Sequence, residues 1–343
     1  MTTRHATPEE IKHWNTHITN NPDGGNILQG KEFIELKTKT GWTARYLFVD
    51  ERAVAVIEKR IPLLGNLWYC PKGPSTSSAD DLEQLCESLR GFAASQGVFT
   101  VKIEPELDHT VDLTRLPLIP TAPVQLNYAT VFVDLSPELD DVMINLNQKG
   151  RHAIRRAERD GVTVKAVPAT DQNCQIMYDL FLETAQGAGF AVRPPDYYRD
   201  FYRAYETIKT GQLFFAYFEG QIVAGAFAMV LGTKSMYKDG ASVRQRTVYG
   251  ASHLLQWHVI QWAKEHGSLQ HDLAGVPPLS ELKNSDHPFA GLARFKTSFN
   301  KQATQFVGAF EIPVVGWKTN LWHRYIEKIT RRLYYKRHRQ SYY

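Results

Sequence analysis

Residues 213–238 read LFFAYFEGQIVAGAFAMVLGTKSMYK, and this stretch decides the fold. It contains three apolar runs, separated by the turn-forming pairs Glu219-Gly220 and Gly232-Thr233. Short runs rich in β-branched and aromatic residues, broken by such pairs, are typical of strands joined by tight turns. The stretch therefore predicts an antiparallel meander with strands over 213–218, 222–231 and 235–238.

Helical patterns flank this meander on both sides. We expect helices over 171–183 and 195–209 before it, and a helix over 251–265 after it, which Gly267 ends as a C-cap. We expect a strand over 269–273 to follow that helix. Helices, a three-stranded meander, a helix and a strand form the element order of an acyltransferase fold of the GNAT type.

The N-terminal half shows a degraded version of the same order. Strands are predicted over 53–58, 67–69, 98–103 and 128–133, and a helix over 80–96. Further helices are predicted from Ser136-Pro137 onward and over 151–159. The fold class we predict is α/β with α+β character: two GNAT-like acyltransferase domains with mixed and antiparallel sheets flanked by helices, joined near Leu135–Pro137.

Length and composition agree with two compact domains. The chain has 343 residues, of which 43% are hydrophobic and 22% charged, a balance that excludes global disorder. Its longest apolar stretch is Ile222–Leu231, whereas a membrane-spanning helix needs about twenty residues. The N-terminus has no apolar segment typical of a secretory signal, so we expect a cytoplasmic protein.

Cysteine usage and charge narrow the function further. Cys70, Cys86 and Cys174 are far apart and lack metal-ligand spacing, so we expect neither a disulfide scaffold nor a metal site. Residues 323–343 hold seven Lys or Arg against one Glu. Such a basic, aromatic-rich tail is either a solvated terminal helix or a surface for an RNA backbone or an anionic membrane.

The segment after the meander argues against coenzyme A. Acetyl-CoA-dependent enzymes of this fold place a glycine-rich loop there, whose backbone N–H groups hold the pyrophosphate. Here the segment 244–252 contains a single glycine, Gly250, preceded by Tyr249. Another activated acyl group is therefore the expected donor.

Four stretches look too particular for packing alone. Residues 148–161 are strongly basic, residues 237–242 end a strand in small side chains, and residues 249–257 open a helix. Residues 291–299 place Lys296 near two aromatic residues, where a partly desolvated ammonium can stabilise an oxyanion. Each has an ordinary alternative: an exposed basic helix, a tight turn, core residues, and a lysine whose stem packs on a ring.

Together and in this order, these stretches resemble the Fem family of peptidoglycan bridge-forming aminoacyltransferases, in its short form without a coiled-coil arm. The matching segments are 27–37, 69–74, 102–105, 149–161, 239–242, 254–257 and 294–299. The resemblance implies a first GNAT-like domain over 1–136 plus 312–343, which binds the acceptor and includes a returning C-terminal helix. It implies a second over 137–311, with the aminoacyl-tRNA side and the catalytic lysine.

The implied reaction moves an aminoacyl group from aminoacyl-tRNA to an amine on the stem peptide of a peptidoglycan precursor. The precursor would be UDP-MurNAc-pentapeptide or lipid II. An aminoacyl ester is already activated, so the enzyme mainly aligns an amine with a carbonyl. We therefore expect no cofactor and no metal. The basic tail gives a possible peripheral contact with the cytoplasmic membrane surface.

The resemblance also implies roles for single residues. Lys296 matches the family lysine that stabilises the tetrahedral intermediate, and Phe295 accompanies it. Lys37 and Arg193 match the residues that hold the acceptor phosphates, with Tyr197 as a neighbour. These residues would line a groove between the two domains.

Other matches are candidates for the amine and for the two substrates. Glu104 is a candidate for orienting the attacking amine or accepting its proton, although a strand-end carboxylate paired with nearby groups is an equal alternative. His253 stands where many relatives have a tyrosine, and Tyr249 precedes it; both are predicted to bind substrate. The candidates for tRNA phosphates are Lys149, Arg151, Arg155 and Arg156.

Three alternatives remain open from the sequence. The same fold could transfer amino acids from tRNA to an acceptor outside peptidoglycan. It could instead be a CoA-dependent N-acyltransferase, in spite of the missing pyrophosphate loop. A third alternative is a non-catalytic module that binds RNA or a membrane.

Overall fold

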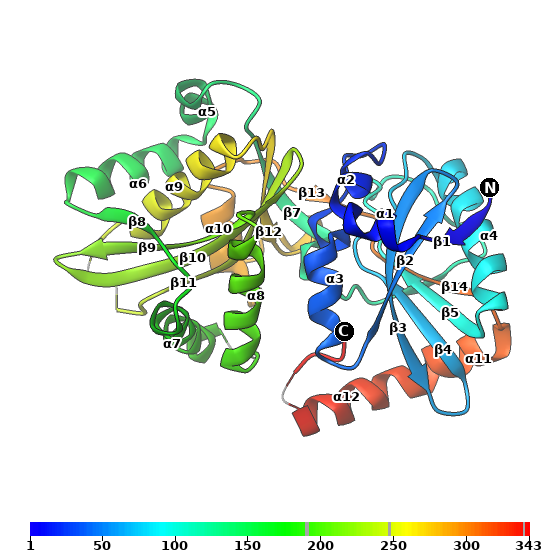
Figure 1. The fold of residues 1–343 in the computed structure, drawn as a ribbon. Coiled ribbons are helices and arrows are strands. Elements are labelled where there is room, and N and C mark those ends of the chain that lie inside the picture. The colour runs from blue at the N-terminus through cyan, green and yellow to red at the C-terminus, as the bar shows by residue number, and fades with distance from the viewer. Residues whose placement is uncertain (189–191, 246–247, 339) are drawn as a thin grey trace. The chain divides into compact units, whose positions relative to one another are not determined.

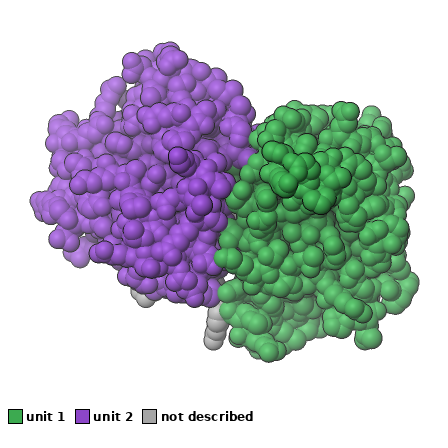
Figure 2. All heavy atoms as spheres, viewed as in Figure 1, with its two compact units in different colours: residues 1–128, 305–343 green, residues 129–304 purple. Residues whose placement is uncertain are grey.

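The computed structural model describes residues 1–188, 192–245, 248–338 and 340–343. The chain divides into two compact units, residues 1–128 with 305–343 and residues 129–304 (Figure 2). These divisions fall earlier in the chain than the sequence-based boundaries at 136 and 311. Within the described ranges each unit contains one seven-stranded sheet flanked by helices, which confirms the predicted fold class (Figure 1).

The first unit begins and ends the chain. Its elements are β1 (Thr3–His5), α1 (Pro8–Lys12), α2 (Trp14–Thr19), η1 (Ile27–Gln29), α3 (Lys31–Thr38), β2 (Thr43–Val49), β3 (Arg52–Ile61), β4 (Gly65–Cys70), α4 (Ala79–Ser95), β5 (Val98–Ile103), β6 (Ile119–Thr121), η2 (Leu126–Tyr128), β14 (Ala309–Pro313), α11 (Gly316–Leu321), the π-helical turn η4 (Trp322–Ile326) and α12 (Glu327–His338).

Its strands follow the order β1-β2-β3-β4-β5-β14-β6. Strands β2, β3 and β4 form antiparallel hairpins, whereas β4 and β5 are parallel because helix α4 carries the chain back across the sheet. Alternate residues of a strand face opposite sides. Thus Leu47 belongs to the core beneath α4, while Tyr46 contacts Trp14 of α2 edge to face.

The C-terminal segment is part of this unit rather than a solvated extension. Lys102 and Glu327 form a buried ion pair at 2.7 Å, and the hydroxyl of Tyr343 donates to the same carboxylate at 2.6 Å. Trp42 donates its indole N–H to the carbonyl of Tyr342 at 3.1 Å. Helix α12 is consequently held against the unit along one face.

The second unit occupies the middle of the chain. Its elements are β7 (Ala129–Asp134), α5 (Leu139–Asn145), α6 (Gln148–Arg159), β8 (Thr163–Val167), α7 (Asp171–Ala188), α8 (Pro195–Thr207), β9 (Gly211–Phe218), β10 (Gln221–Leu231), β11 (Lys234–Ser242), α9 (Ala251–Glu265), β12 (Gln270–Gly275), η3 (Leu279–Glu281), α10 (Ala290–Lys296) and, at the boundary, β13 (Thr304–Gln305).

The second unit repeats the topology of the first. Its sheet order is β13-β7-β12-β11-β10-β9-β8, with an antiparallel meander β9-β10-β11 followed by a parallel β11-β12 pair that α9 connects. Helices α6 and α9 cover one face, and α7 and α8 cover the other (Figure 1). The meander predicted from residues 213–238 is confirmed, and so is the helix over 251–265.

The sequence analysis places the start of one helix wrongly and omits strand β2. The helix expected from Ser136-Pro137 begins only at Leu139, because the Ser136 hydroxyl and backbone N–H both bond to the carboxylate of Asp134 and close a turn instead. Strand β2 has no counterpart in the sequence prediction, although it forms the first hairpin with β3.

None of the described residues forms a helix of the length and apolarity that crossing a membrane requires.

Gly250 precedes helix α9 and has a positive φ of 84°. A Cβ at this position would lie 2.3 Å from the carbonyl oxygen of Ala153 on α6. Helices α6 and α9 can therefore pack this closely only if residue 250 is a glycine. We expect Gly250→Ala to lower the free energy of unfolding by about 2 kcal/mol or more. Urea unfolding followed by circular dichroism measures this.

The matched control is Gly91→Ala in the interior of α4, where a Cβ would meet nothing within 4 Å. Alanine should raise stability there by about 0.5–1 kcal/mol, since glycine is a poor helix former. Equal effects of the two substitutions would contradict the packing role of Gly250.

Candidate active site

The sheet of the second unit opens where β11 and β12 part. Their parallel pairing runs from Lys234↔Gln270 to Met236↔Asp272, yet β11 continues to Ser242 alongside β10 alone among the described strands. In the first unit the corresponding strands stay paired as far as Cys70↔Ile103. The separation of two parallel strands therefore belongs to the second unit.

The end of β12 carries an irregularity beside this separation. Its pairing with β7 shifts register between Asp272 and Gly275, and Ala274 adopts φ of 61°. The side chain of Asp272 holds the bulge together, since its Oδ1 accepts from the backbone N–H of Ala274 at 2.7 Å and contacts the Thr130 hydroxyl. The bulge turns the carbonyl of Gly275 toward helix α10.

Lys296, the last residue of α10, binds that carbonyl. Its Nζ donates to the oxygen of Gly275 at 2.8 Å, and only 6% of the residue is exposed. Burial lowers the pKa of Lys296 to about 8, while the negative charge of Asp272 acts in the opposite direction. The ammonium is thus partly desolvated and held at a fixed point beside the end of β12.

An aromatic cluster adjoins Lys296. Phe295 contacts His253 edge to face with ring centroids 5.0 Å apart, and His253 stacks on Phe299 at 5.6 Å. The Nε2 of His253 lies 3.1 Å from the hydroxyl oxygen of Ser298. His253 therefore makes both ring contacts and a polar contact at the position where many relatives have a tyrosine.

The basic helix α6 is locked to the same segment. A Cβ on Gly150 would lie 2.3 Å from the carbonyl oxygen of Ser298, so only glycine permits this approach. Asn147 donates its backbone N–H to the carbonyl of Phe299 at 3.0 Å and its side-chain amide to that of Thr297 at 3.1 Å. The start of α6 and the residues after Lys296 consequently form one rigid piece.

The basic residues of α6 fall into two groups. Lys149, Arg155 and Arg156 are exposed, and the guanidinium of Arg156 lies 5.0 Å from the ring centroid of Tyr249. Arg151 is half-buried and donates to the carbonyls of Ile144 and Leu146 at the end of α5. Arg151 thus has a structural role in addition to any contact with a ligand.

Arg193 and Tyr197 lie together at the start of α8. The guanidinium of Arg193 stacks 4.5 Å from the ring centroid of Tyr197, and its backbone N–H donates to the hydroxyl oxygen of Tyr198 at 3.4 Å. Residues 189–191, which precede Arg193 in the segment predicted to hold phosphate, lie outside the described residues.

The ring of Tyr237 explains why β11 ends in small residues. A Cβ on Gly240 would fall 1.5 Å from the hydroxyl oxygen of Tyr237, so this ring lies along its own strand over the glycine. Asp239 accepts from Lys238 at 2.9 Å and from the Tyr202 hydroxyl at 3.2 Å. Burial and the charge of Asp239 raise the pKa of Tyr202, which keeps its hydroxyl as a donor.

Glu104 belongs to the first unit, directly after β5. One carboxylate oxygen accepts from the backbone N–H groups of Val124 and Gln125 at 2.7 and 3.0 Å, and the other accepts from the Tyr69 hydroxyl at 2.5 Å. Gln125 also donates to the Tyr69 hydroxyl oxygen at 3.0 Å. In this arrangement Glu104 anchors the segment before β7, and its part in proton transfer stays a prediction.

Lys37 is also in the first unit, near the end of α3. It is 5% exposed, and its Nζ lies 5.0 Å from the ring centroid of Phe33. The role predicted for it in phosphate binding stays a prediction, as do those of the other site residues.

The structure thus brings together Lys296, Phe295 and His253 with the start of α6, Arg156 with Tyr249, and Arg193 with Tyr197. Sequence reasoning missed Asp272 and Tyr202. The sequence signal for Asp272 was weak, a single acid inside a predicted strand, where a charged residue is rarely buried without a partner.

The described residues offer neither a metal cluster nor a reactive thiol. No group of three or more His, Cys, Asp or Glu among them has the geometry to hold a metal ion. Burial raises the pKa of Cys86 to about 12 and that of Cys174 to about 11, and it also raises the pKa of Cys70. These thiols remain protonated near neutral pH, unlike a cysteine nucleophile.

Two units with the same GNAT-type strand order, one of which opens beside a buried lysine, define the class of tandem acyltransferases. The sequence pattern of the FemAB family matches residues 9–115, 121–221 and 206–324. The chain belongs to the FemAB family and is a transferase, as the resemblance in the sequence predicted.

Curated relatives agree with this assignment. A lipid II:glycine glycyltransferase of Staphylococcus saprophyticus is 23% identical in an alignment that covers 84% of this chain and 88% of the relative. The enzyme with the same name from Staphylococcus aureus strain MRSA252 is 21% identical and covers 91% of this chain and 92% of its own length.

Solved structures are similar in fold. The crystal structure of FemX matches with a TM-score of 0.77 at 19% identity, covering 94% of this chain and 99% of FemX. The C-terminal domain of a putative lysylphosphatidylglycerol synthetase from Agrobacterium fabrum matches with a TM-score of 0.50 at 14% identity, covering 92% and 96%.

The site generates a prediction on pH. If the ammonium of Lys296 is the active form, turnover should fall as the pH rises through about 8, the pKa given above. Asp272→Asn removes a charge that favours the ammonium, so this fall should move to lower pH by about one unit. The measurement is the initial rate of transfer as a function of pH at saturating substrates.

Asp286→Asn is the matched control, since Asp286 is exposed in the loop before α10. It should leave the pH profile unchanged. An alkaline limb at the same pH in Asp272→Asn and in the unsubstituted chain would show that Asp272 does not set the charge of Lys296.

Proposed function

We propose that this chain transfers an amino acid from aminoacyl-tRNA to an amine on the stem peptide of a peptidoglycan precursor, as a step in the synthesis of the interpeptide bridge. The observation that carries the proposal is the buried ammonium of Lys296, bound to the carbonyl of Gly275 where β11 and β12 part. Family membership supports the same conclusion.

The chemistry needs one positive charge rather than a covalent intermediate. The amine attacks the carbonyl carbon of the aminoacyl ester, and a C–N bond forms while negative charge collects on the carbonyl oxygen. An ammonium has three N–H donors, and Gly275 accepts from one of them, so Lys296 can direct another to this oxyanion. The C–O bond to the ribose then breaks, the ribose oxygen takes a proton, and the amine loses one.

The donor side of the proposal rests on helix α6. Exposed cations bind RNA through its phosphates and without reading the sequence, which suits an enzyme that recognises the end of a tRNA. Because Gly150 and Asn147 fix the start of α6 to the residues after Lys296, an RNA bound along α6 has its aminoacyl end guided toward that lysine.

The acceptor side rests on Arg193 and Lys37. A guanidinium binds two oxygens of one phosphate through its planar fork, and stacking on Tyr197 keeps that fork in one orientation. The relatives are named for action on lipid II, so we propose the lipid-linked precursor as acceptor in preference to the nucleotide-linked one.

The test is transfer by the purified chain. Labelled aminoacyl-tRNA, glycyl-tRNA first, is incubated with lipid II or with UDP-MurNAc-pentapeptide, and the product is identified by mass spectrometry. Label on the stem-peptide amine supports the proposal. Transfer to neither acceptor from any aminoacyl-tRNA would refute it, and thiol release from acetyl-CoA with an amine acceptor would indicate a CoA-dependent enzyme instead.

Lys296→Ala should reduce kcat by about 100-fold or more and leave the KM for acceptor nearly unchanged, because the oxyanion forms only in the transition state. Steady-state kinetics of transfer measures both constants. Lys301→Ala, an exposed lysine after the same helix, is the control and should retain full activity. A parallel loss of thermal stability with no selective loss of kcat would leave Lys296 a packing residue.

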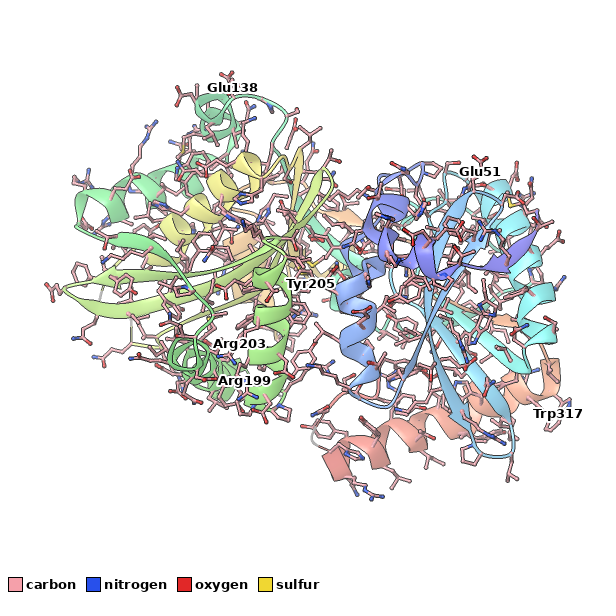
Figure 3. All side chains as sticks on the ribbon, viewed as in Figure 1. Glu51, Glu138, Arg199, Arg203, Tyr205 and Trp317 are labelled. Atoms are coloured by element: carbon pink, nitrogen blue, oxygen red, sulfur yellow. The ribbon has the colours of Figure 1, made fainter. Side chains whose placement is uncertain are left out.

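Arg193→Lys should raise the KM for acceptor about tenfold and change kcat little, since a point charge replaces a planar fork that binds two oxygens. Arg199→Lys serves as control, because Arg199 lies on helix α8, which begins two residues after Arg193, and forms ion pairs with Asp196 and Asp200 (Figure 3). An acceptor KM that is identical in both variants would exclude Arg193 from acceptor binding.

A further inference from the structure

The C-terminal helical segment exposes a regular apolar row. Trp317, Leu321, Tyr325, Ile329 and Leu333 follow one another at intervals of four residues, and their exposed fractions range from 37% for Leu321 to 64% for Trp317. Figure 3 places Trp317 at the outer edge of the first unit beside α11. A patch of this length on a water-facing helix is unusual, since large exposed apolar patches mark contact surfaces.

Helix geometry keeps this row on one face. In an α-helix, residues four apart are displaced by about 40° around the axis, so such a row would drift around the helix. The π-helical turn η4 lies between α11 and α12 and takes more residues per turn, which opposes the drift in the step from Leu321 to Tyr325. The buried residues Thr319, Trp322 and Glu327 fix the opposite face to the unit.

A row of cations runs beside the apolar row. Arg324, Lys328, Arg332 and Lys336 are exposed and also follow at intervals of four. The sole acidic residue between 316 and 338 is Glu327, and its carboxylate is buried against Lys102. The exposed face of residues 316–338 is therefore apolar and positively charged, and it carries no carboxylate of its own.

The β3–β4 hairpin contacts the start of this helical segment and exposes a further apolar residue. Leu63, at the tip of its turn, is 100% exposed and has φ of 66°, a backbone conformation that leucine rarely adopts. The carbonyl of the next residue, Leu64, accepts from Nζ of Lys318 on α11 at 2.8 Å. In Figure 1 this hairpin and α11 lie at the same edge of the unit.

We propose that the apolar row, the cation row and Leu63 form a docking surface for an anionic lipid bilayer. Amphipathic helices with aromatic and aliphatic residues beside Lys and Arg lie in the plane of the bilayer interface, with the apolar face among the acyl chains. The cations meet the negative headgroups, which attract basic segments within a Debye length. The lipid-linked acceptor proposed above resides in such a bilayer.

An RNA backbone fits this surface less well. Phosphates account for the cations, but they give no reason to expose leucine, isoleucine and tryptophan along the same helix. The exposed cations of α6 differ in this respect, because Ala153, Ile154 and Ala157 on that helix are buried. We therefore assign a lipid surface to α11–α12 and keep RNA binding for α6.

The experiment is vesicle flotation of the full chain with two variants. The apolar variant is Leu63→Ser with Trp317→Ser and Ile329→Ser, and the charge variant is Arg324→Gln with Lys328→Gln and Arg332→Gln. All six side chains are exposed, so both variants should fold, which thermal unfolding checks. Vesicles contain phosphatidylcholine alone or with an equal amount of phosphatidylglycerol.

Matched controls carry the same changes on the second unit. They replace the exposed Ile144, Ile208 and Leu269 by serine, or the exposed Lys209, Lys283 and Lys301 by glutamine. We expect the unsubstituted chain and both controls to bind the anionic vesicles. The apolar variant should bind these vesicles about tenfold more weakly at any salt concentration. In the charge variant, the affinity for the vesicles should no longer depend on the salt concentration.

Two outcomes would overturn the proposal. One is that the unsubstituted chain does not float with anionic vesicles, or that neither variant binds them more weakly than its control. The other is that the charge variant loses affinity for uncharged tRNA while the apolar variant keeps its vesicle binding, which would make the surface an RNA site.

This inference rests on the proposed function only for the reason why the protein would bind a membrane, namely to reach a lipid-linked acceptor. Flotation needs neither donor nor acceptor, so a chain that floats but transfers nothing would refute the reaction and leave the surface standing. Conversely, if the surface is correct, the apolar variant should transfer to the water-soluble nucleotide acceptor normally and to lipid II in vesicles poorly.

Discussion

The chemistry proposed for the second unit depends on a lysine ammonium that is held away from water. Lys296 keeps its position because the bulge in β12 presents the carbonyl of Gly275, and the bulge persists because Asp272 binds the backbone N–H of Ala274 and contacts Thr130. Burial disfavours the charge and the nearby carboxylate favours it. A charge prepared in this way costs little reorganisation when an oxyanion forms, which is the general condition for electrostatic catalysis.

The two units share one fold but differ at the end of the parallel strand pair. Both have a meander followed by a parallel strand pair, but the pair stays closed in the first unit and opens in the second. At the end of the closed pair, Glu104 binds two backbone N–H groups and the Tyr69 hydroxyl. The duplicated architecture thus leaves one unit with two parted strands, while the other uses the equivalent position to anchor a connecting segment.

Much of the fold was predictable because it follows from local pattern. The three apolar runs of residues 213–238 and the helix over 251–265 needed only periodicity and turn residues. Strand β2 and the late start of α5 were missed, since pairing partners and a side-chain turn at Asp134 decide them. At the site, Lys296 stood out in the sequence. Asp272 did not, because its significance depends on a bulge that the order of residues does not reveal.

The sequence by itself determined the class of fold, the family and the residue types available for chemistry, because motifs and hydrophobic periodicity are properties of order along the chain. Only the tertiary structure decided which glycines permit close approach, where the sheet opens, and that Lys296 is desolvated beside a carboxylate. It also decided that Leu63 and the apolar row of α11–α12 are exposed, and that the hairpin of Leu63 is bound to α11 through Lys318. Burial and approach are relations between segments distant in sequence, so they exist only once the chain has packed.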